Sequence, residues 1–375
     1  MLQIGINGLH IKWGVNAGTE TYLTNIIKPW YESRIRDLCF TLYCNQLPPW
    51  WIGEKAFFKA ELHPLAATLP GRLFLEQIVL PLAAYRKLDL LFCPGYVGSI
   101  MFRKLQIITI HDGFAWRYPL EIGRMRGLYW RTAIPLSAKR AARLIAVSQS
   151  TADDVANFCQ IPSSKISVIL EAGEHLKEIV PNKDIFQELG ISHKAYFHCV
   201  GIFKEVKNPW RLFEAYKEYI DTCSLTERKQ LVLVGRCEGK RAKEILLAAR
   251  DIPNVIIAGR IDDHQLAAIY EGSAGLIFPS LYEGFGIPIL EAQSFDCPVI
   301  TSNNSSMPEV GGEGVILVNP YCINSICRAL HAISNGAAQA LVEKGRNNLT
   351  RFSWKITSDQ TLELIRDVAS GEGIV

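Results

Sequence analysis

Short runs of β-branched and apolar residues recur along the chain, and a longer amphipathic stretch separates each from the next. Within a run, apolar and polar residues do not alternate, which is typical of parallel strands covered on both faces. Repeated strand and helix patterns of this kind predict right-handed β-α-β crossovers and doubly wound α/β sheets. Six strands are expected in the first half, at Leu2–Asn7, Cys39–Asn45, Leu88–Cys93, Gln106–His111, Leu144–Ser148 and Ile166–Leu170. Six more are expected in the second half, at Tyr196–Gly201, Leu231–Gly235, Val255–Gly259, Gly275–Pro279, Val299–Ser302 and Val315–Val318.

Twelve strands are too many for one sheet of this type in a chain of 375 residues, so we predict two similar domains. The first is expected at residues 1–180 and the second at residues 190–352, because the stretch Glu171–Lys194 is polar, contains Pro181 and lacks a strand. A final helix over residues 355–375 is expected to pack back on the first domain. Ligands bind beyond the carboxyl ends of strands in open parallel sheets, so two facing sheets would form one cleft.

Composition excludes several other classes of protein. Forty Lys and Arg against 37 Asp and Glu give a formal charge of +3, which is too balanced for a typical duplex-binding protein. The first residues lack the basic and long apolar regions of a signal peptide, and the apolar stretch Leu73–Leu82 contains Glu76, Gln77 and Pro81. We therefore expect a cytoplasmic protein. Ten cysteines without a C-x-x-C pair fit that compartment, and no metal site is expected.

The stretch 278–307, FPSLYEGFGIPILEAQSFDCPVITSNNSSM, carries the most chemical information. It predicts a strand ending at Pro279, a glycine-containing loop and a helix beginning near Pro288, where proline is favourable. Glu283 would lie on the loop and Glu291 about one turn into the helix, so both could face one ligand. Backbone N–H groups around Gly286 and Ile287 would suit a phosphate. Two glutamates with seven residues between them are more often solvent-facing when they occur alone, but the whole string is far more restrictive.

This string resembles the signature of the family 4 retaining glycosyltransferases, which have the GT-B fold of two Rossmann-like domains. Further segments resemble the motifs of that family in the same order along nearly the entire chain. They are GVNAGTETY (Gly14–Tyr22), TIHDG (Thr109–Gly113), VSQS (Val147–Ser150), VGIFKEVKN (Val200–Asn208), VILVNP (Val315–Pro320) and RFSW (Arg351–Trp354).

The resemblance implies transfer of a hexose from a nucleotide sugar to a hydroxyl group, with the anomeric configuration retained. His111 would contact the donor sugar, with Asp112 orienting its ring, and Glu283 would face the sugar. Glu291 would accept hydrogen bonds from the ribose. A front-face displacement is implied, in which a leaving phosphate oxygen takes the acceptor proton. The GT-B resemblance and the absence of a D-x-D motif both point to stabilisation of the leaving group without a metal, and no cofactor is expected.

Lys207 is the residue expected to neutralise the leaving diphosphate. Gly18, in a glycine-containing loop that would allow positive φ, is expected to let the backbone approach the same group. Many relatives carry further cations where this chain has Val206 and Ile202, so Lys204 or Arg236 would have to supply a second positive charge.

The acceptor is expected to be a saccharide or a lipid-linked molecule bound by the first domain. Trp50–Trp51, Phe57–Phe58 and the stretch 117–131 are aromatic and basic, which suits a peripheral contact at the inner membrane face. The same residues also fit a solvated loop with core aromatics.

Several other functions are compatible with the same fold. A nucleotide-sugar epimerase, a phosphorylase-like enzyme or a degenerate, non-catalytic sugar-binding protein would share the fold. A Walker A NTPase and a dinucleotide dehydrogenase are disfavoured, because neither G-x-x-x-x-G-K-[ST] nor a suitably placed G-x-G-x-x-G occurs. The donor could be GDP- or UDP-linked, with mannose slightly favoured, in a pathway of polysaccharide biosynthesis.

Overall fold

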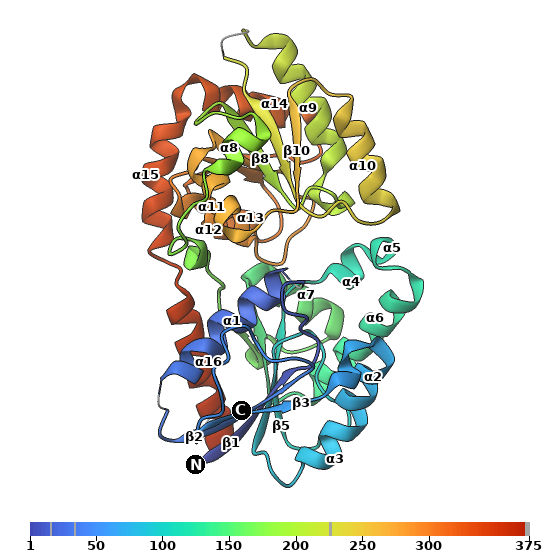
Figure 1. Ribbon diagram of the computed structural model, residues 1–375. Coiled ribbons are helices and arrows are strands. Elements are labelled where there is room, and N and C mark those ends of the chain that lie inside the picture. Colours follow the sequence, from blue (N-terminus) through green and yellow to red (C-terminus); the bar gives the residue numbers. More distant parts are fainter. Residues whose placement is uncertain (16, 34, 225–226, 372–375) are drawn as a thin grey trace. The chain divides into compact units, whose positions relative to one another are not determined.

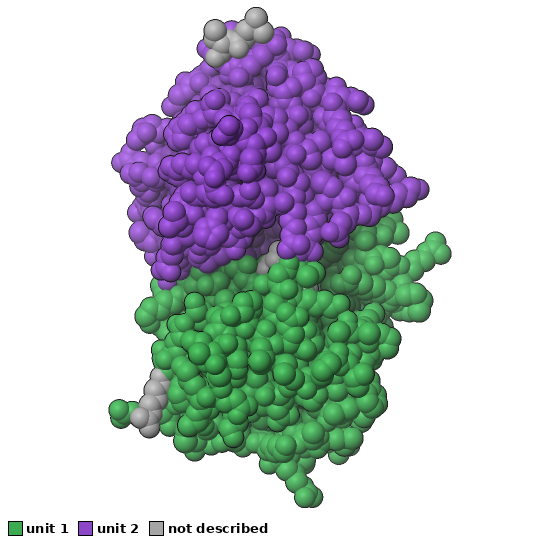
Figure 2. All heavy atoms as spheres, in the orientation of Figure 1, with its two compact units in different colours: residues 1–171, 354–375 green, residues 172–353 purple. Residues whose placement is uncertain are grey.

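The computed structural model describes residues 1–15, 17–33, 35–224 and 227–371. The chain divides into two compact units, which Figure 2 shows in different colours: unit 1 comprises residues 1–171 and 354–375, and unit 2 comprises residues 172–353. Asn16 of the predicted glycine-containing loop and the last four residues of the predicted terminal helix lie outside the described residues.

Unit 1 is built on a parallel sheet with the strand order β3-β2-β1-β4-β5-β6-β7, seven strands within the described residues. The strands are β1 (Leu2–Gly8), β2 (Leu38–Cys44), β3 (Phe58–Leu62), β4 (Leu90–Cys93), β5 (Leu105–Ile110), β6 (Arg143–Ala146) and β7 (Ile166–Val168). All six strands predicted for this half are confirmed. The additional strand, β3, pairs with β2 at the edge of the sheet. Its short sequence FKAEL mixes charged and apolar residues, so it lacks the continuous apolar run used to predict the others.

Helices cover both faces of this sheet (Figure 1). One side carries α1 (Ala17–Glu32) and the terminal helix α16 (Trp354–Ser370), in which Ser358 donates a hydrogen bond to the Ile26 carbonyl. The other side carries α2 (Leu69–Phe74), a π-helical turn (Leu75–Val79), α3 (Leu80–Ala84), α6 (Arg124–Arg140) and α7 (Gln149–Cys159). All of these except α2 contribute buried side chains to one core with Leu91, Ile108 and Leu144. The short helices are 3-10 turns at Pro64–Ala67 and Ser163–Lys165, α4 (Phe114–Arg117) and α5 (Pro119–Ile122).

Unit 2 contains a second parallel sheet, with the strand order β10-β9-β8-β11-β12-β13 in the described residues. The strands are β8 (Tyr196–Val200), β9 (Gln230–Val234), β10 (Val255–Gly259), β11 (Gly275–Phe278), β12 (Val299–Ser302) and β13 (Val315–Val318). All six were predicted from the sequence. Two Rossmann-like, parallel-sheet domains are therefore confirmed.

The helices of unit 2 follow the strands in the expected alternation. They are α8 (Asp184–Leu189), α9 (Pro209–Thr222), α10 (Lys240–Arg250), α11 (Asp263–Gly272), α12 (Ile287–Ser294), α13 (Met307–Gly311), α14 (Ile323–Ala332) and α15 (Ala338–Leu349). Three shorter turns lie at Glu174–Leu176, Glu205–Lys207 and Ile333–Ala337. Throughout the described ranges of both units, no helix is long and apolar enough to cross a membrane.

Candidate functional site

The loop after β8 places Lys207 at the carboxyl edge of the second sheet. Gly201, at φ 71°, turns the chain out of the strand, and its N–H donates to the Val234 carbonyl at 2.8 Å. Asn208 ends the loop in the left-handed conformation, at φ 62°. Its buried side-chain amide donates to the carbonyls of Pro279 and Pro320, 3.1 and 2.7 Å away. One amide thus ties together the loops that follow β8, β11 and β13.

Lys207 and Glu283, predicted separately from two motifs, form an ion pair in the structure. The ammonium nitrogen of Lys207 lies 2.6 Å from a carboxylate oxygen of Glu283 and 4.5 Å from the centre of the Phe278 ring. The two side chains are only 17% and 16% exposed. Partial burial strengthens this charge pair relative to one in bulk water, and it leaves one edge of the pair accessible.

The Glu283 loop is held by the serines that follow β12. The Glu283 N–H donates to Ser305 Oγ at 3.1 Å. Ser306 Oγ lies within hydrogen-bonding distance of the carbonyls of Glu283 (3.0 Å) and Phe285 (2.6 Å). These bonds come from the SNNSS segment, which sequence analysis quoted but gave no role. They hold the backbone of the loop that carries Glu283.

Helix α12 begins directly after this loop, as predicted. Gly286 precedes it at φ 108°, a conformation that favours glycine. Pro288 occupies the first turn, where its missing N–H costs little. The positive end of the helix dipole therefore lies close in sequence to Glu283, with Gly286 and Ile287 at its start.

Glu291 lies deeper on α12 and is buried with two partners. Tyr270 OH donates to one of its oxygens at 2.6 Å, and His175 Nε2 lies 3.3 Å from the other. Burial lowers the pKa of His175, but the hydrogen bond and charge of Glu291 outweigh it and hold this pKa above the ordinary value of 6.5. Burial, together with the Glu291 charge, raises the pKa of Tyr270 well above its usual range.

The segment that carries His175 can approach α12 because residue 173 is glycine. A Cβ atom added to Gly173 would lie 2.5 Å from Leu290 Cβ and 2.6 Å from the Glu291 nitrogen. No sequence motif singled out His175 or Tyr270. His175 lies in the polar stretch interpreted as a domain join, and Tyr270 lies on α11, to which no motif was assigned.

Arg236 follows β9, the strand next to β8, and is partly buried. The two strand ends approach closely, since a Cβ atom on Gly235 would lie 3.2 Å from Gly201 Cα. Val206 and Ile202 are buried. These two apolar side chains anchor the Lys207 loop to the core, and they add no charge at its surface.

His111 follows β5 in unit 1 and has both ring nitrogens engaged. Nδ1 lies 3.1 Å from a Glu171 oxygen, and Nε2 lies 2.8 Å from the Pro94 carbonyl. Both partners are acceptors, which favours the doubly protonated imidazolium. Burial lowers the pKa of His111, but the bond to Glu171 and its charge outweigh that effect, so the pKa lies above its ordinary value.

The expectation that Asp112 orients the His111 ring is wrong, because a different carboxylate bonds the ring. Asp112 accepts a hydrogen bond from Tyr96 OH at 2.5 Å and another from the Phe114 N–H at 2.9 Å. Glu171 bonds the ring instead. Glu171 follows shortly after β7. Its position just beyond a predicted strand is the sequence feature that could have identified it.

Gly18 lies in the first turn of α1, and the residue of the predicted glycine-containing loop that has a positive φ is Gly14, at 74°. A Cβ atom added to Gly18 would meet nothing within 4 Å. The fold of unit 1 itself therefore does not require glycine at this position.

The aromatic residues assigned to acceptor loops are mostly packed within unit 1. Phe58 belongs to β3 and is fully buried, and Trp51 packs between Tyr31 and Phe58. Trp116 stacks on Phe158, and Trp130 stacks on Tyr96. The stretch 117–131 forms helices and short turns, so the core-aromatic alternative describes these rings better.

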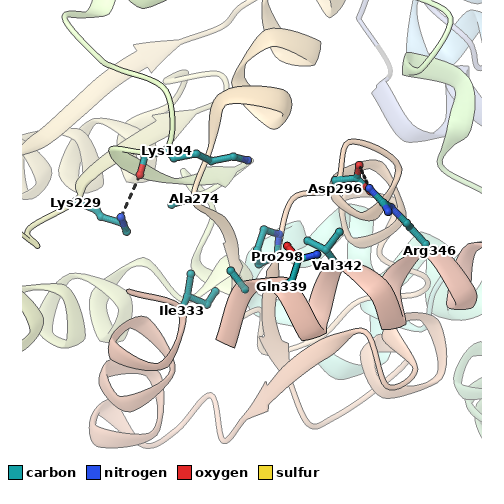
Figure 3. A pocket seen from close by; sticks show the side chains of 10 residues that line it. Lys194, Lys229, Ala274, Asp296, Pro298, Ile333, Gln339, Val342 and Arg346 are labelled. Atoms are coloured by element: carbon teal, nitrogen blue, oxygen red, sulfur yellow. Dashed lines mark hydrogen bonds and ion pairs between the residues drawn. The ribbon is translucent and has the colours of Figure 1, made fainter. Parts of the chain in front are cut away.

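A cavity of about 400 Å³ opens elsewhere in unit 2. Figure 3 shows it lined by Lys194, Lys229, Asp296 and Arg346, among others. Its charges are already satisfied: Arg346 pairs with Asp296, and Lys229 donates to the Lys194 carbonyl. None of the predicted site residues lines this cavity.

Two family models match the chain in succession. Residues 57–170 match the model described as Glycosyltransferase Family 4, and residues 181–348 match Glycosyl transferases group 1. The chain belongs to family 4 of the glycosyltransferases. The resemblance inferred from the motifs is thereby confirmed.

Named relatives of this family 4 chain include bacterial mannosyltransferases. The chain is 28% identical to the O-antigen chain mannosyltransferase RfbU of Salmonella typhimurium, over 59% of each protein. It is also 28% identical to the serotype-specific mannosyltransferase WbdA of Escherichia coli, over 60% of this chain and 29% of the relative. The chain thus spans less than two thirds of the length of these relatives.

Solved structures share the fold over nearly the whole chain. Sucrose-phosphate synthase from Thermosynechococcus elongatus superposes with a TM-score of 0.75 at 18% identity, covering 99% of this chain and all of that one. Anabaena HepE in complex with UDP-glucose superposes with a TM-score of 0.72 at 18% identity, over 98% of this chain and all of that one. At these identities the likeness shows the GT-B fold alone.

Proposed function

We propose that the chain transfers a hexose, with mannose favoured, from a nucleoside diphosphate sugar to a hydroxyl of a saccharide or lipid-linked acceptor. The observation that carries the proposal is the Lys207–Glu283 pair, 2.6 Å apart at the loop that leads into α12. The names of the relatives support mannose, and GDP and UDP both remain candidate nucleotides.

Lys207 would stabilise the departing nucleoside diphosphate. As the bond to the sugar breaks, negative charge builds on a phosphate oxygen, and an ammonium group already held nearby offsets that charge. The amino end of α12 adds a positive dipole for the same anion. Glu283, with its backbone fixed by Ser305 and Ser306, would accept hydrogen bonds from hydroxyl groups of the sugar.

Glu291 would accept hydrogen bonds from the ribose of the nucleotide. Tyr270 and His175 already donate to its two oxygens, but each carboxylate oxygen has a further lone-pair direction. These two residues would therefore position the carboxylate rather than compete for it.

The proposed stereochemical course is retention by front-face displacement, in which a leaving phosphate oxygen takes the acceptor proton. His111, held as an imidazolium by Glu171, would contact the donor sugar. We propose that no metal takes part, since the sequence lacks D-x-D and Lys207 supplies positive charge.

The test begins with thermal unfolding in the presence of GDP and UDP, because a nucleotide that binds the folded state raises its stability. Sugar transfer is then measured with the matching GDP- or UDP-linked donor, with and without EDTA, and the product anomer is assigned by NMR. Lys207→Ala should lower kcat/KM by about 10²- to 10³-fold. Lys240→Ala, an exposed lysine on α10, is the matched control and should retain full activity.

Several outcomes would overturn the proposal. Donor epimerised without acceptor would indicate an epimerase, and cleavage that requires inorganic phosphate would indicate a phosphorylase. Nucleotide binding without any turnover would indicate a degenerate binding protein. Loss of transfer in EDTA, restored by a divalent cation, would contradict metal independence.

A further inference from the structure

A buried carboxylate near the carboxyl edge of the unit 1 sheet has no place in the proposed donor site. Glu76, in the π-helical turn, is only 6% exposed. Burial raises its pKa to about 7, although the charge of Arg72 and a side-chain hydrogen bond from Asn7 both lower it. Arg72 Nε lies 3.7 Å from the carboxylate, which is too far for a hydrogen bond. These two partners therefore do not satisfy a carboxylate so deeply buried.

Folding alone does not explain a glutamate at this position. A carboxyl whose pKa is raised on folding destabilises the folded state when it is ionised, because the unfolded chain holds that charge in water. For Glu76 the cost begins above its ordinary pKa of 4.5 and is complete above about pH 7. A residue that reduces stability in this way is typical of a binding or catalytic site.

Two further polar atoms in the same region are buried and, among the described residues, make no hydrogen bond: Arg72 Nε and His10 Nε2. Burial and the Arg72 charge lower the pKa of His10 to about 3, so its ring is neutral and can accept or donate one hydrogen bond at Nε2. Tyr129 of α6 is close enough to be affected by the charges of Glu76 and Arg72, and burial raises its pKa to about 12. We call these residues the Glu76 cluster: Asn7, His10, Arg72, Glu76 and Tyr129.

The Glu76 cluster lies next to His111. His10 follows β1, and a Cβ atom on Gly95 would lie 2.4 Å from its Nε2, so the His10 ring packs against the residue that follows Pro94. The Pro94 carbonyl in turn lies 2.8 Å from His111 Nε2. The charge of His111 also contributes to the low pKa of His10. Ligands of open parallel sheets bind beyond the carboxyl ends of the strands, and at this edge His111 is proposed to meet the donor sugar.

We propose that the Glu76 cluster binds neutral sugar hydroxyl groups of the acceptor beside His111. This inference rests on the proposed function, because it assigns a binding site to the acceptor of the same transfer. The cluster combines a carboxylate, a guanidinium, an imidazole, an amide and a phenol, so it can both accept and donate hydrogen bonds. Adjacent hydroxyl groups of a sugar can do the same. An anionic acceptor group would be repelled by Glu76, and a cationic one by Arg72.

The proposal is tested by calorimetric titration of the full chain, with and without GDP or UDP, with the methyl α-glycosides of mannose, glucose and galactose. At about pH 8, Glu76→Gln should lower the affinity for the glycoside that wild type binds best by about tenfold or more, because a hydrogen bond to a charged group is lost. Glu54→Gln, which alters an exposed glutamate of unit 1, is the matched control and should bind as wild type. Mannose 6-phosphate, an anionic probe, should bind more weakly than methyl mannoside.

The pH profile of glycoside binding separates recognition from a structural role. Near pH 7 Glu76 is the group of the cluster expected to titrate, because Arg72 stays charged, Tyr129 stays protonated and His10 stays neutral. The buried Cys93 thiol, whose pKa is about 12, also interacts with Glu76 and stays protonated. Wild-type affinity should therefore rise about tenfold between about pH 6 and about pH 8. Glu76→Gln should abolish this rise, and Arg72→Gln should move its midpoint to higher pH, because a charge that lowers the Glu76 pKa is lost.

Thermal unfolding checks that the variants fold. Glu76→Gln removes a buried charge, so its unfolding temperature at about pH 8 should equal or exceed that of wild type. A lower temperature would show that the fold itself requires the carboxylate and would overturn the argument from stability.

No binding of any of the three glycosides by wild type would overturn the proposal, as would a Glu76→Gln variant with wild-type affinity and pH profile. Tighter binding of mannose 6-phosphate that depends on Arg72 would assign the cluster to an anionic ligand instead. Nucleotide binding by wild type is measured on the same preparation. Nucleotide binding without glycoside binding would reject this cluster alone and leave the proposed donor site standing, whereas the absence of both would count against the proposed function itself.

Discussion

Each unit contains a histidine paired with a buried carboxylate, and the two pairs reverse their roles. In unit 1, His111 is the residue expected to meet the sugar, and Glu171 fixes its ring and its charge. In unit 2, Glu291 is expected to meet the nucleotide, while His175 and Tyr270 fix the carboxylate. The same chemical pair can therefore serve either role, a histidine held by a carboxylate or a carboxylate held by a histidine.

The second difference between the pairs lies in the further groups that each pair contacts. His111 bonds Glu171 and the Pro94 carbonyl, so both nitrogens are held. The His175 pair instead extends through Glu291 to Tyr270. We expect loss of the Glu171 charge to be more damaging than a change at His175, because Glu171 sets the charge of the group proposed to contact substrate.

The largest effect is expected for Glu171→Gln. The amide can still bond the ring but carries no negative charge, so the pKa of His111 should fall and the imidazolium should become less populated. We expect kcat/KM for transfer to fall about 100-fold near neutral pH and to recover in part at lower pH. A pH–rate profile checks this, with NMR titration of the His111 ring. A profile identical in shape to wild type would mean that Glu171 has no role in setting that charge.

Gly173→Ala is expected to disrupt the unit 2 pair by steric conflict. The new methyl group would clash with the backbone of α12 at Leu290 and Glu291, at a cost of about 2 kcal/mol in unfolding free energy. Denaturant unfolding measures the loss. Gly18→Ala, where the methyl group meets nothing within 4 Å, is the control and should leave stability unchanged. Equal stability of the two variants would show that the approach at Gly173 is not tight.

The paired histidines and His198 are expected to change the stability of the fold with pH in opposite directions. Because the pKa values of His111 and His175 are raised in the folded protein, protonation of the two rings contributes its full stabilisation below about pH 6.5. That contribution is lost as the pH rises through the pKa values of the folded state. His198 acts in the opposite direction. Burial lowers its pKa to about 3, so its neutral form favours folding above pH 6.5, and that advantage is lost as pH falls toward 3.

His198→Gln should therefore gain stability relative to wild type as the solution is made acidic. Between about pH 8 and about pH 5, the difference in unfolding free energy should shift by about 2 kcal/mol in favour of the variant. Urea unfolding at several pH values measures it. A difference that stays constant with pH would show that His198 titrates normally in the folded protein.

The smallest effect is expected for His175→Gln, which keeps a hydrogen-bond donor but removes the positive charge beside Glu291. Affinity for the nucleoside diphosphate should fall only about fivefold, with kcat nearly unchanged, because the carboxylate keeps its bond from Tyr270. Calorimetric titration with GDP and UDP measures the change. A large loss of kcat instead would place His175 closer to the chemistry than Glu291.

The sequence predicted the strands well because buried parallel strands carry continuous apolar runs. It failed for β3, an edge strand whose sequence FKAEL mixes charges with apolar residues. It also predicted that Lys207, Glu283 and the start of α12 belong to one site, and the ion pair between Lys207 and Glu283 brings the first two together. His175 and Tyr270 carried no such signal, since each is an ordinary residue type in its own segment, and Glu171 was marked only by its position just beyond a predicted strand.

The sequence by itself determined the two parallel sheets, the order of their strands along the chain and the loops that carry the conspicuous motifs. These features depend on local apolar periodicity and on glycine and proline chemistry, which a linear string records. Only the tertiary structure decided which carboxylate holds which histidine, and that Asn7 and Tyr129 approach Glu76 from other elements. Both depend on contacts between residues far apart in the chain, and no local pattern specifies them.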